Sequence, residues 1–416
     1  MISEGKKNIL KIASDLIFSI GGLVAMNGVL QLFLYPKIEK TIGAAANDNV
    51  LTLLSVVSIL ATMFGTSANY SRMVAKTHGR SNNGDYNFFL LLTFPIAAVV
   101  SALGVRLVTG KWNILSCILL SILSIFSILR YYGDVEFRLN VNYKKFSFYY
   151  VLIAIGYFAG TFLVWKNVFG NDYSWLAAFI IGEAIAVAYV FLRGEIFRGK
   201  DVIKPQETFN ENLKSIMFLL GTNFINAFVL KSDTIFIKAF VGQGGTVTTF
   251  YVATLIGKIV ALLTTPLNGV IIGYLTKYEG RFSKRFFATA VGIALGVGVL
   301  FTLCCWPVSH VFVKIMYDAE VYNAAKPYFL LANAGQVLYF ISGSMMVVVL
   351  RFIHERWQLI INIIYAVLYA AIVIPLLIKF GLWGITYGLL IVNALRFLMV
   401  VILGFFKIRR NEIEKT

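Results

Sequence analysis

Long apolar runs alternate with short polar gaps along the whole chain. A helix needs about 20 mostly apolar residues to cross the bilayer, and by this measure runs of sufficient length recur about twelve times. The predicted spans are 9–35, 50–75, 86–108, 113–135, 146–166, 173–193, 213–241, 248–275, 286–307, 326–350, 357–378 and 381–406. The pattern therefore predicts an all-α, polytopic membrane protein.

Composition supports the same class. Hydrophobic residues make up 59% of the chain, charged residues only 14%, and the mean hydropathy is +0.79. A soluble domain is near half apolar and a quarter charged, so a soluble protein is excluded. The basic start, residues 1–11, runs straight into the first span without a cleavage-site pattern, and we expect no cleavable signal peptide.

Loop cations predict the orientation of the spans. Most lysines and arginines fall in the loops that share a side with the N-terminus, and such loops are normally cytoplasmic. An even number of spans then places both termini in the cytoplasm. This bias explains most of the net charge of +17 without nucleic acid as a partner, and it provides contacts for membrane lipid head groups.

The longest polar stretch, residues 193–214, divides the chain into two halves. Each half opens with a span that closes on a similar phrase, residues 36–43 and 233–242, with apolar residues around a lysine and a final glycine. We expect an N-terminal six-helix lobe (1–193), a cytoplasmic linker (194–212) and a C-terminal six-helix lobe (213–416), arranged as parallel repeats.

Charged residues inside the apolar runs are the first candidates for function, because a charge at membrane depth is costly unless it faces a bundle interior or a wet cavity. The cations are Lys258 and Arg396 near mid-span and Arg72 and Arg130 in end turns; the acids are Asp15, Glu183 and Asp233. The cations suit an anionic cargo. Alternatively, Lys258 and Arg396 pair with Glu183 or Asp15 to fix helix packing, and Arg72 and Arg130 snorkel to the interface.

Polar neutral residues extend this set. Asn27 and Gln31 lie one turn apart, Asn226 shares a helical face with Asp233, Asn393 lies one turn before Arg396, and Tyr251 and Thr254 precede Lys258 on one stripe. They are candidate cavity residues, although interhelical hydrogen bonds explain amides equally well. A buried carboxylate binds H⁺ or Na⁺ as a coupling ion, or it neutralises a neighbouring cation; both interpretations stay open.

Catalytic and cofactor motifs do not appear in the sequence. The three cysteines and three histidines have no metal-ligand or disulfide spacing, and no phosphate-binding loop for ATP is present. We therefore expect no enzyme activity, no metal and no cofactor. Energy for transport would come from an ion gradient, from the membrane potential or from consumption of the cargo.

Several phrases, in order along the chain, resemble the polysaccharide flippases of Wzx type, within the multidrug/oligosaccharidyl-lipid/polysaccharide exporter (MOP) superfamily. They are YPKIEKTIG (35–43), GTSANYSR (65–72), SDTIFI (232–237), YVATLI (251–256) and FGLWGI (380–385). The resemblance covers essentially the whole chain. One departure is Lys40, where many relatives have arginine; lysine keeps the charge but loses the planar fork for phosphate.

The resemblance implies a bacterial inner-membrane flippase with two lobes forming a V that opens alternately to each side. Its cargo would be an undecaprenyl-pyrophosphate-linked oligosaccharide, moved from the inner to the outer leaflet for assembly of O-antigen lipopolysaccharide, capsule or a related polymer. A polysaccharide polymerase and a chain-length regulator would be partners. The resemblance also raises Arg72 as the residue that first captures phosphate from the inner leaflet.

Two other functions compete. A multidrug or cation antiporter of the same superfamily would need an apolar pocket with one or two acids rather than several buried cations. A membrane glycosyltransferase or polysaccharide polymerase would need a large outer loop with catalytic residues, and the longest outer loop expected here, residues 307–326, is too short.

Overall fold

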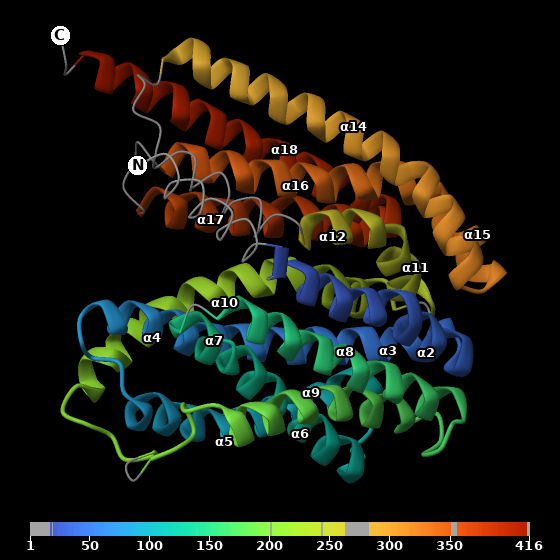
Figure 1. Cartoon of the computed structure of the whole chain (residues 1–416). Helices are drawn as coiled ribbons and strands as arrows, with labels where there is room; N and C mark the ends of the chain where they lie inside the picture. Colours follow the sequence, from blue (N-terminus) through green and yellow to red (C-terminus); the bar gives the residue numbers. More distant parts are fainter. Residues whose placement is uncertain are drawn as a thin grey trace. The chain divides into compact units, whose positions relative to one another are not determined.

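The protein is all-helical (Figure 1). The computed structural model describes residues 17–140 except 19, together with 142–199, 202–242, 244–262, 283–350 and 356–413. Within these ranges the helices are η1 (Leu30–Leu34), α2 (Tyr35–Ile42), α3 (Ala44–Leu60), η2 (Ala61–Thr66), α4 (Ser67–Thr77), α5 (Asn83–Thr109), α6 (Ile114–Gly133), α7 (Val135–Leu139), α8 (Tyr143–Trp165), α9 (Ser174–Arg193), α10 (Phe209–Phe240), α11 (Thr246–Ala253), α12 (Leu255–Leu262), α14 (Lys284–Met316), α15 (Ala319–Ala325), η3 (Lys326–Tyr328), α16 (Phe329–Leu350), α17 (Arg356–Leu368), η4 (Tyr369–Val373) and α18 (Ile374–Ile413). Helices satisfy all their backbone polar groups internally, as a lipid environment requires.

Each predicted span is helical over most of the residues that the structure describes. The start of the first span and the end of the eighth lie outside the described residues. Among the described residues, nine helices are long and apolar enough to cross a membrane. The last of these, residues 357–407, contains both predicted C-terminal spans. They are separated at Gly381, whose φ of 56° is a backbone conformation that glycine adopts without strain.

Prolines inside the spans have different consequences. Pro36 and Pro375 each follow a π-helical segment, η1 and η4, that ends two residues earlier. A proline removes one backbone donor, and the wider π turn next to it accommodates the loss. Pro95 and Pro307 lie within α5 and α14, while Pro266 lies outside the described residues.

Residues 307–326, expected to form an outer loop, are mostly helical. α14 continues past Pro307 to Met316, and α15 follows from Ala319 to Ala325. Non-polar residues on both sides of the proline continue the apolar face, so the helix persists. Much of α14 is exposed apolar surface, including Ile293, Leu300 and Val311, as expected of a helix that faces lipid.

The chain forms two compact units. Unit 1 comprises Met1–Ser232 and unit 2 comprises Asp233–Thr416, so that α10 begins in unit 1 and ends in unit 2. The predicted lobes, 1–193 and 213–416, were defined as two repeats and not as compact units, and the division into these lobes stays a prediction.

Small residues set the packing of unit 1. α8 packs on α9, and α6 packs on both α5 and α9 (Figure 1). A Cβ added to Gly156 would lie 2.8 Å from the Cα of Gly182, and one added to Gly160 would lie 2.7 Å from the Cα of Ala178. The two glycines, one turn apart on α8, therefore let the helix backbones approach closely, which is the common way to pack helices where apolar lipid offers no hydrophobic driving force.

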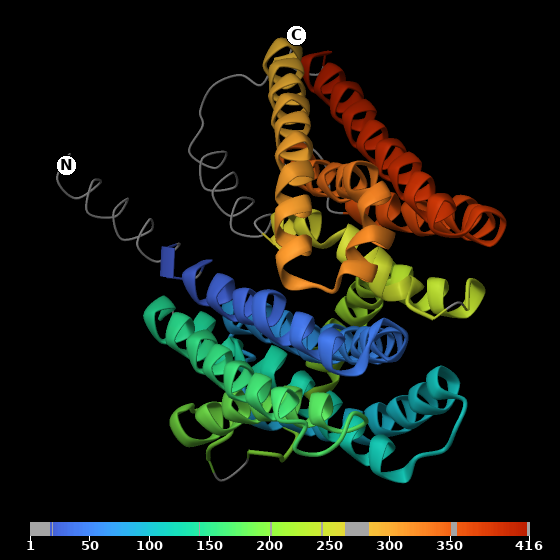
Figure 2. The same ribbon diagram turned by 90° about the vertical axis from the view of Figure 1, so that its right-hand side faces the viewer.

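Unit 2 is organised around α16. This helix packs against α18, α14 and α12; Figure 2 shows the helices of this unit, coloured from yellow through orange to red, from a second side. Its buried side chains, such as Phe340, Met345 and Val349, form a hydrophobic core with Phe287 of α14 and Val400 of α18. α16 thus supplies the rigid support for the polar side chains of this unit.

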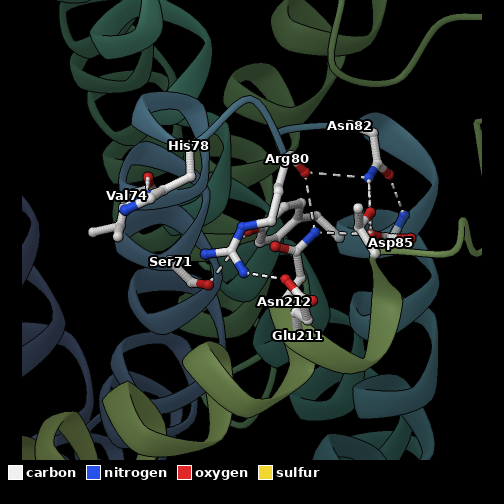
Figure 3. A network of polar contacts seen from close by, with 10 residues as sticks. Ser71, Val74, His78, Arg80, Asn82, Asp85, Glu211 and Asn212 are labelled. Atoms are coloured by element: carbon white, nitrogen blue, oxygen red, sulfur yellow. Dashed lines mark hydrogen bonds and ion pairs between the residues drawn. The ribbon is translucent and has the colours of Figure 1, made fainter.

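The predicted linker is held against unit 1 by a buried carboxylate (Figure 3). Asp85, fully buried, accepts hydrogen bonds from the side chains of Asn82, Thr208 and Asn212 and from the backbone N–H of Gln206, at 2.7–2.8 Å. Asn82 also caps α5 by accepting from the Asp85 N–H. A carboxylate that accepts this many hydrogen bonds stays charged. The linker is therefore fixed in place by its hydrogen bonds to Asp85, and we call the linker held in this way the strap.

We expect Asp85→Ala to release this strap. It leaves several buried donors without an acceptor, each costing about 1–3 kcal/mol, and it should lower the free energy of unfolding by about 3 kcal/mol or more. Limited trypsin digestion should then cut faster after Arg198 or Lys204. The control is Glu211→Ala, which breaks the exposed pair with Arg80 (side chains 31% and 63% exposed) and should cost less than about 1 kcal/mol. Equal effects of the two substitutions would contradict the strap.

Candidate functional site

Lys258 and Asp233 form an ion pair in unit 2. Lys258 Nζ lies 2.8 Å from Asp233 Oδ2, and the side chains are 27% and 5% exposed. Asp233 Oδ1 accepts from the Thr234 N–H at 2.8 Å, and the ammonium lies 5.3 Å from the centre of the Tyr251 ring. The Lys258 ammonium is thus neutralised by Asp233, while the Lys258 side chain stays partly exposed. Pairing of Lys258 was one of the expected outcomes, but the observed partner is Asp233 rather than the expected Glu183; Asp15, the other expected partner, lies outside the described residues.

A break in the helix precedes Lys258. α11 ends at Ala253 and α12 begins at Leu255, and the hydroxyl of Thr254, fully buried, donates back to Phe250 O at 3.0 Å. The expectation that Thr254 lines a cavity with Lys258 is therefore wrong. The break is bridged by Asn333 of α16, a residue that the sequence interpretation missed; an amide in the apolar run LLANAGQ was the available signal.

Arg396 of α18 is buried between two tyrosine rings. Its guanidinium carbon lies 4.3 Å from the Tyr339 ring centre and 5.1 Å from that of Tyr365, and the residue is 8% exposed. Within the described part of the chain, Arg396 Nε and Nη1 are buried and donate to no acceptor. The rings stabilise the cation from their faces, and they leave the N–H groups available to an anion that enters in the guanidinium plane.

Asn393 fixes this arrangement. Its Oδ1 accepts from the Tyr365 hydroxyl at 2.8 Å, and its Nδ2 donates to Gly335 O of α16 at 2.9 Å. Asn393 is 2% exposed, so it holds Tyr365 in position from within the packed interior. This is the interhelical role that was the alternative expectation for such amides.

Aromatic contacts connect Arg396 with the Asp233 end of α10. Tyr365 packs on Tyr369, and Tyr369 packs on Phe236, one turn after Asp233. Tyr365 interacts electrostatically with both Arg396 and Asp233. We call the set Asp233, Tyr251, Lys258, Tyr339, Tyr365 and Arg396 the unit 2 cluster. It combines two cations, one carboxylate and three tyrosines.

Unit 1 contains a second buried ion pair. Arg130 Nε lies 2.6 Å from Glu183 Oε2, with the side chains 9% and 4% exposed. Tyr157 donates to Glu183 Oε1 at 2.7 Å, and the guanidinium lies 4.3 Å from the Tyr131 ring centre. Every charge here has a protein partner, so the pair joins α6 to α9 as a structural element.

Arg72 is also held by the protein. It donates to the Tyr132 hydroxyl, to Asn83 Oδ1 at 2.6 Å and to Ser81 Oγ at 3.3 Å, and it is 5% exposed. It lines a cavity of about 250 Å³ together with Lys76 and Glu136. The snorkelling interpretation of Arg72 and Arg130 is wrong, because both side chains turn inward to partners on neighbouring helices. Contact of either with cargo stays a prediction.

The remaining candidates lie in the first predicted span and in α10. Asn27 donates to Leu23 O of its own helix at 2.9 Å. Gln31 and Asn226 are half-buried, in η1 and α10, and their predicted roles stay predictions. Asp15 lies outside the described residues.

Comparison with known proteins places the fold. No protein-family model and no curated protein matches the sequence. The lipid II flippase MurJ in an inward closed conformation matches with a TM-score of 0.70 at 16% identity, over 95% of this chain and 90% of MurJ. A multidrug resistance MATE family transporter of the MOP superfamily, inward-facing, matches with a TM-score of 0.63 at 13% identity, over 98% and 99%. A MOP superfamily transporter from Pyrococcus furiosus, described by the reverse polarity of its binding pocket, matches at 0.62 and 13%, over 98% and 95%.

These matches define the class: the chain is a multi-pass membrane protein with the fold of MOP superfamily transporters. This confirms the predicted all-α, MATE-like fold. The structural neighbours are transporters and flippases rather than enzymes. At such low identity the likeness extends to the fold alone, so the cargo must be argued from the side chains of this chain.

Proposed function

We propose that this protein is a flippase for undecaprenyl-pyrophosphate-linked oligosaccharides, moving them from the inner to the outer leaflet by alternating access. The observation that carries the proposal is Arg396, a buried guanidinium between two tyrosine rings with N–H groups that no described residue accepts from. A guanidinium donates in a planar fork that matches phosphate oxygens. The adjacent tyrosines offer flat apolar faces with hydroxyl groups, which suit sugar rings.

Lys258 supplies the second cation of the proposed site. Its side chain is 27% exposed and its charge is held by Asp233, so an incoming phosphate would exchange with the Asp233 carboxylate rather than meet a bare ammonium. Two cations of different geometry suit the two phosphates of a pyrophosphate. In this proposal Tyr251 contacts the glycan beside Lys258. Arg72 and Arg130, both in unit 1, stay candidates for cargo contact.

The setting follows from the same proposal. The protein would lie in the bacterial inner membrane with both termini in the cytoplasm, and a polysaccharide polymerase and chain-length regulator would take its product into O-antigen, capsule or a related polymer. MurJ, described as a lipid II flippase, supports a lipid-linked cargo by its fold. Asp233 and Glu183 remain candidates for coupling H⁺ or Na⁺, which would require their cation partners to release them.

A multidrug or cation antiporter is the second candidate, favoured by the MATE transporters among the structural neighbours. A cationic drug needs an accessible carboxylate. In the described part of the chain Asp233 is held by Lys258 and Glu183 by Arg130, which supports the anionic cargo instead. A membrane glycosyltransferase or polymerase has less support, because residues 307–326 are mostly helical.

The proposal is tested in bacterial cells that lack their own polysaccharide flippase and produce this chain. Restored surface polysaccharide in these cells is the expected result, with loss of that polymer when Lys258 and Arg396 are both replaced by alanine and the protein is still present in the membrane. Drug resistance without restored polymer would instead support the antiporter.

A further inference from the structure

Asn333 of α16 is inserted into the backbone of another helix. In a continuous α-helix the N–H of residue 257 would donate to the C=O of residue 253. Here Asn333 Oδ1 accepts from Gly257 N at 2.6 Å, and Asn333 Nδ2 donates to Ala253 O at 3.1 Å. The side-chain amide thus takes the place of this backbone hydrogen bond and satisfies both the Ala253 carbonyl and the Gly257 N–H.

The break is short. Thr254 N donates to Phe250 O at 3.1 Å and Lys258 N donates to Thr254 O at 2.9 Å, as in a regular helix, while the Thr254 hydroxyl donates to Tyr251 O at 3.1 Å. α11 and α12 are therefore joined at a local opening around Thr254, and Lys258 is the residue directly after Gly257. The orientation of α12, and with it the place of the Lys258 side chain, depends on how wide the opening is held.

Asn333 is itself firmly placed. It is fully buried, and its Nδ2 also approaches Phe329 O at 2.6 Å and Ser309 Oγ at 3.1 Å. Gly257 provides the space for it: an added Cβ would lie 2.8 Å from Gln336 Cβ and 2.9 Å from Asn333 Oδ1. Glycine at 257 and asparagine at 333 form one matched junction.

We propose that Asn333 is a positioning residue that holds the helix open between Ala253 and Gly257 and thereby sets Lys258 against Asp233. Without the amide, Ala253 C=O and Gly257 N–H bond to each other, α11 and α12 become one straight helix, and the ammonium leaves the carboxylate. The importance of this for transport rests on the proposed function; the effect on the ion pair does not.

The test measures the Lys258–Asp233 interaction without cargo, by a double-mutant cycle in melting temperature. In the otherwise unchanged protein, Asp233→Asn and Lys258→Met each break the same pair. The double variant should therefore lose less in melting temperature than the sum of the two single losses, by roughly 3 °C or more. We call this difference the shortfall. In an Asn333→Leu background the shortfall should vanish. An unchanged shortfall would overturn the proposal.

Further variants keep the test decisive. Gly257→Ala displaces Asn333 from the other side of the junction and should abolish the shortfall too. If neither Asn333→Leu nor Gly257→Ala folds, Asn333→Asp replaces them in the test: it keeps the acceptor but loses the donor to Ala253, so the shortfall should again vanish. Ser309→Ala removes one contact of Asn333 outside the break, and Asn362→Leu removes another buried asparagine of unit 2; both should leave the shortfall unchanged. Loss of the shortfall in these controls as well would make Asn333 merely a packing residue.

Cargo binding separates this inference from the proposed function. If the protein binds a lipid-linked oligosaccharide, Asn333→Leu should weaken that binding as much as Lys258→Ala, and the double variant should be no weaker. If the ion-pair shortfall disappears in Asn333→Leu but the unchanged protein binds no such lipid, the positioning role stands and the proposed function fails.

Discussion

Replacing Glu183 with alanine should leave little folded protein in the membrane. The substitution strands Arg130 at 9% side-chain exposure with its ion-pair partner removed, and breaking a buried pair from one side costs about 3–5 kcal/mol. Tyr157 loses its acceptor as well. We expect a fall in folded yield, measured by size-exclusion chromatography of solubilised protein, and a melting temperature lower by roughly 10 °C.

The matched control replaces the whole pair. Arg130→Met with Glu183→Leu removes both charges together and fills similar volume, and such replacements are often neutral or stabilising. Its stability should therefore lie well above that of Glu183→Ala, close to the unchanged protein. A double variant as unstable as the single one would show that the charges, and not their pairing, matter.

Replacing Arg396 with alanine should weaken binding of a pyrophosphate-linked glycan about 10- to 100-fold, because a hydrogen bond to a charged group contributes about 1.5–3 kcal/mol. The variant should fold, since within the described residues the guanidinium holds no ion pair and its Nε and Nη1 make no hydrogen bond. Tryptophan fluorescence or calorimetric titration of the purified protein measures the affinity.

Two variants isolate the reason for that loss. Arg396→Lys keeps the charge but not the planar fork between Tyr339 and Tyr365, so its affinity should fall between those of the unchanged protein and the alanine variant. Lys379→Ala removes an exposed cation from the same unit and should bind as the unchanged protein does. Equal losses in Arg396→Ala and Lys379→Ala would mean that only overall charge attracts the cargo.

The membrane spans could be predicted from the sequence because hydropathy is a strong and local signal. The boundary at Gly381 and the turn after Thr109 appear in the structure where the pattern placed them. α14 is longer than the predicted span 286–307 and continues past Pro307 to Met316, because a membrane helix tolerates proline where neighbours satisfy the freed carbonyl.

The partners of the charges could not be predicted in the same way. The depth of Lys258 was clear from its place in an apolar run, but its pairing with Asp233 depends on how α12 is turned, and the break that turns it is made by Asn333 of a distant helix. Likewise, Arg130 lies near a span end, where snorkelling is normal, yet Glu183 on α9 draws it inward. Such contacts follow from tertiary packing and carry no periodic signal.

The proposed function requires transport of a lipid-linked glycan through the unit 2 cluster. The most direct measurement is translocation of a fluorescent undecaprenyl-pyrophosphate-linked oligosaccharide across vesicles that contain the purified protein, followed by quenching from outside. We predict that the unchanged protein speeds translocation over empty vesicles, that Arg396→Ala with Lys258→Ala reduces it to the level of empty vesicles, and that Lys379→Ala has no effect. If the double alanine variant translocates the lipid as fast as the unchanged protein, transport through the unit 2 cluster is contradicted.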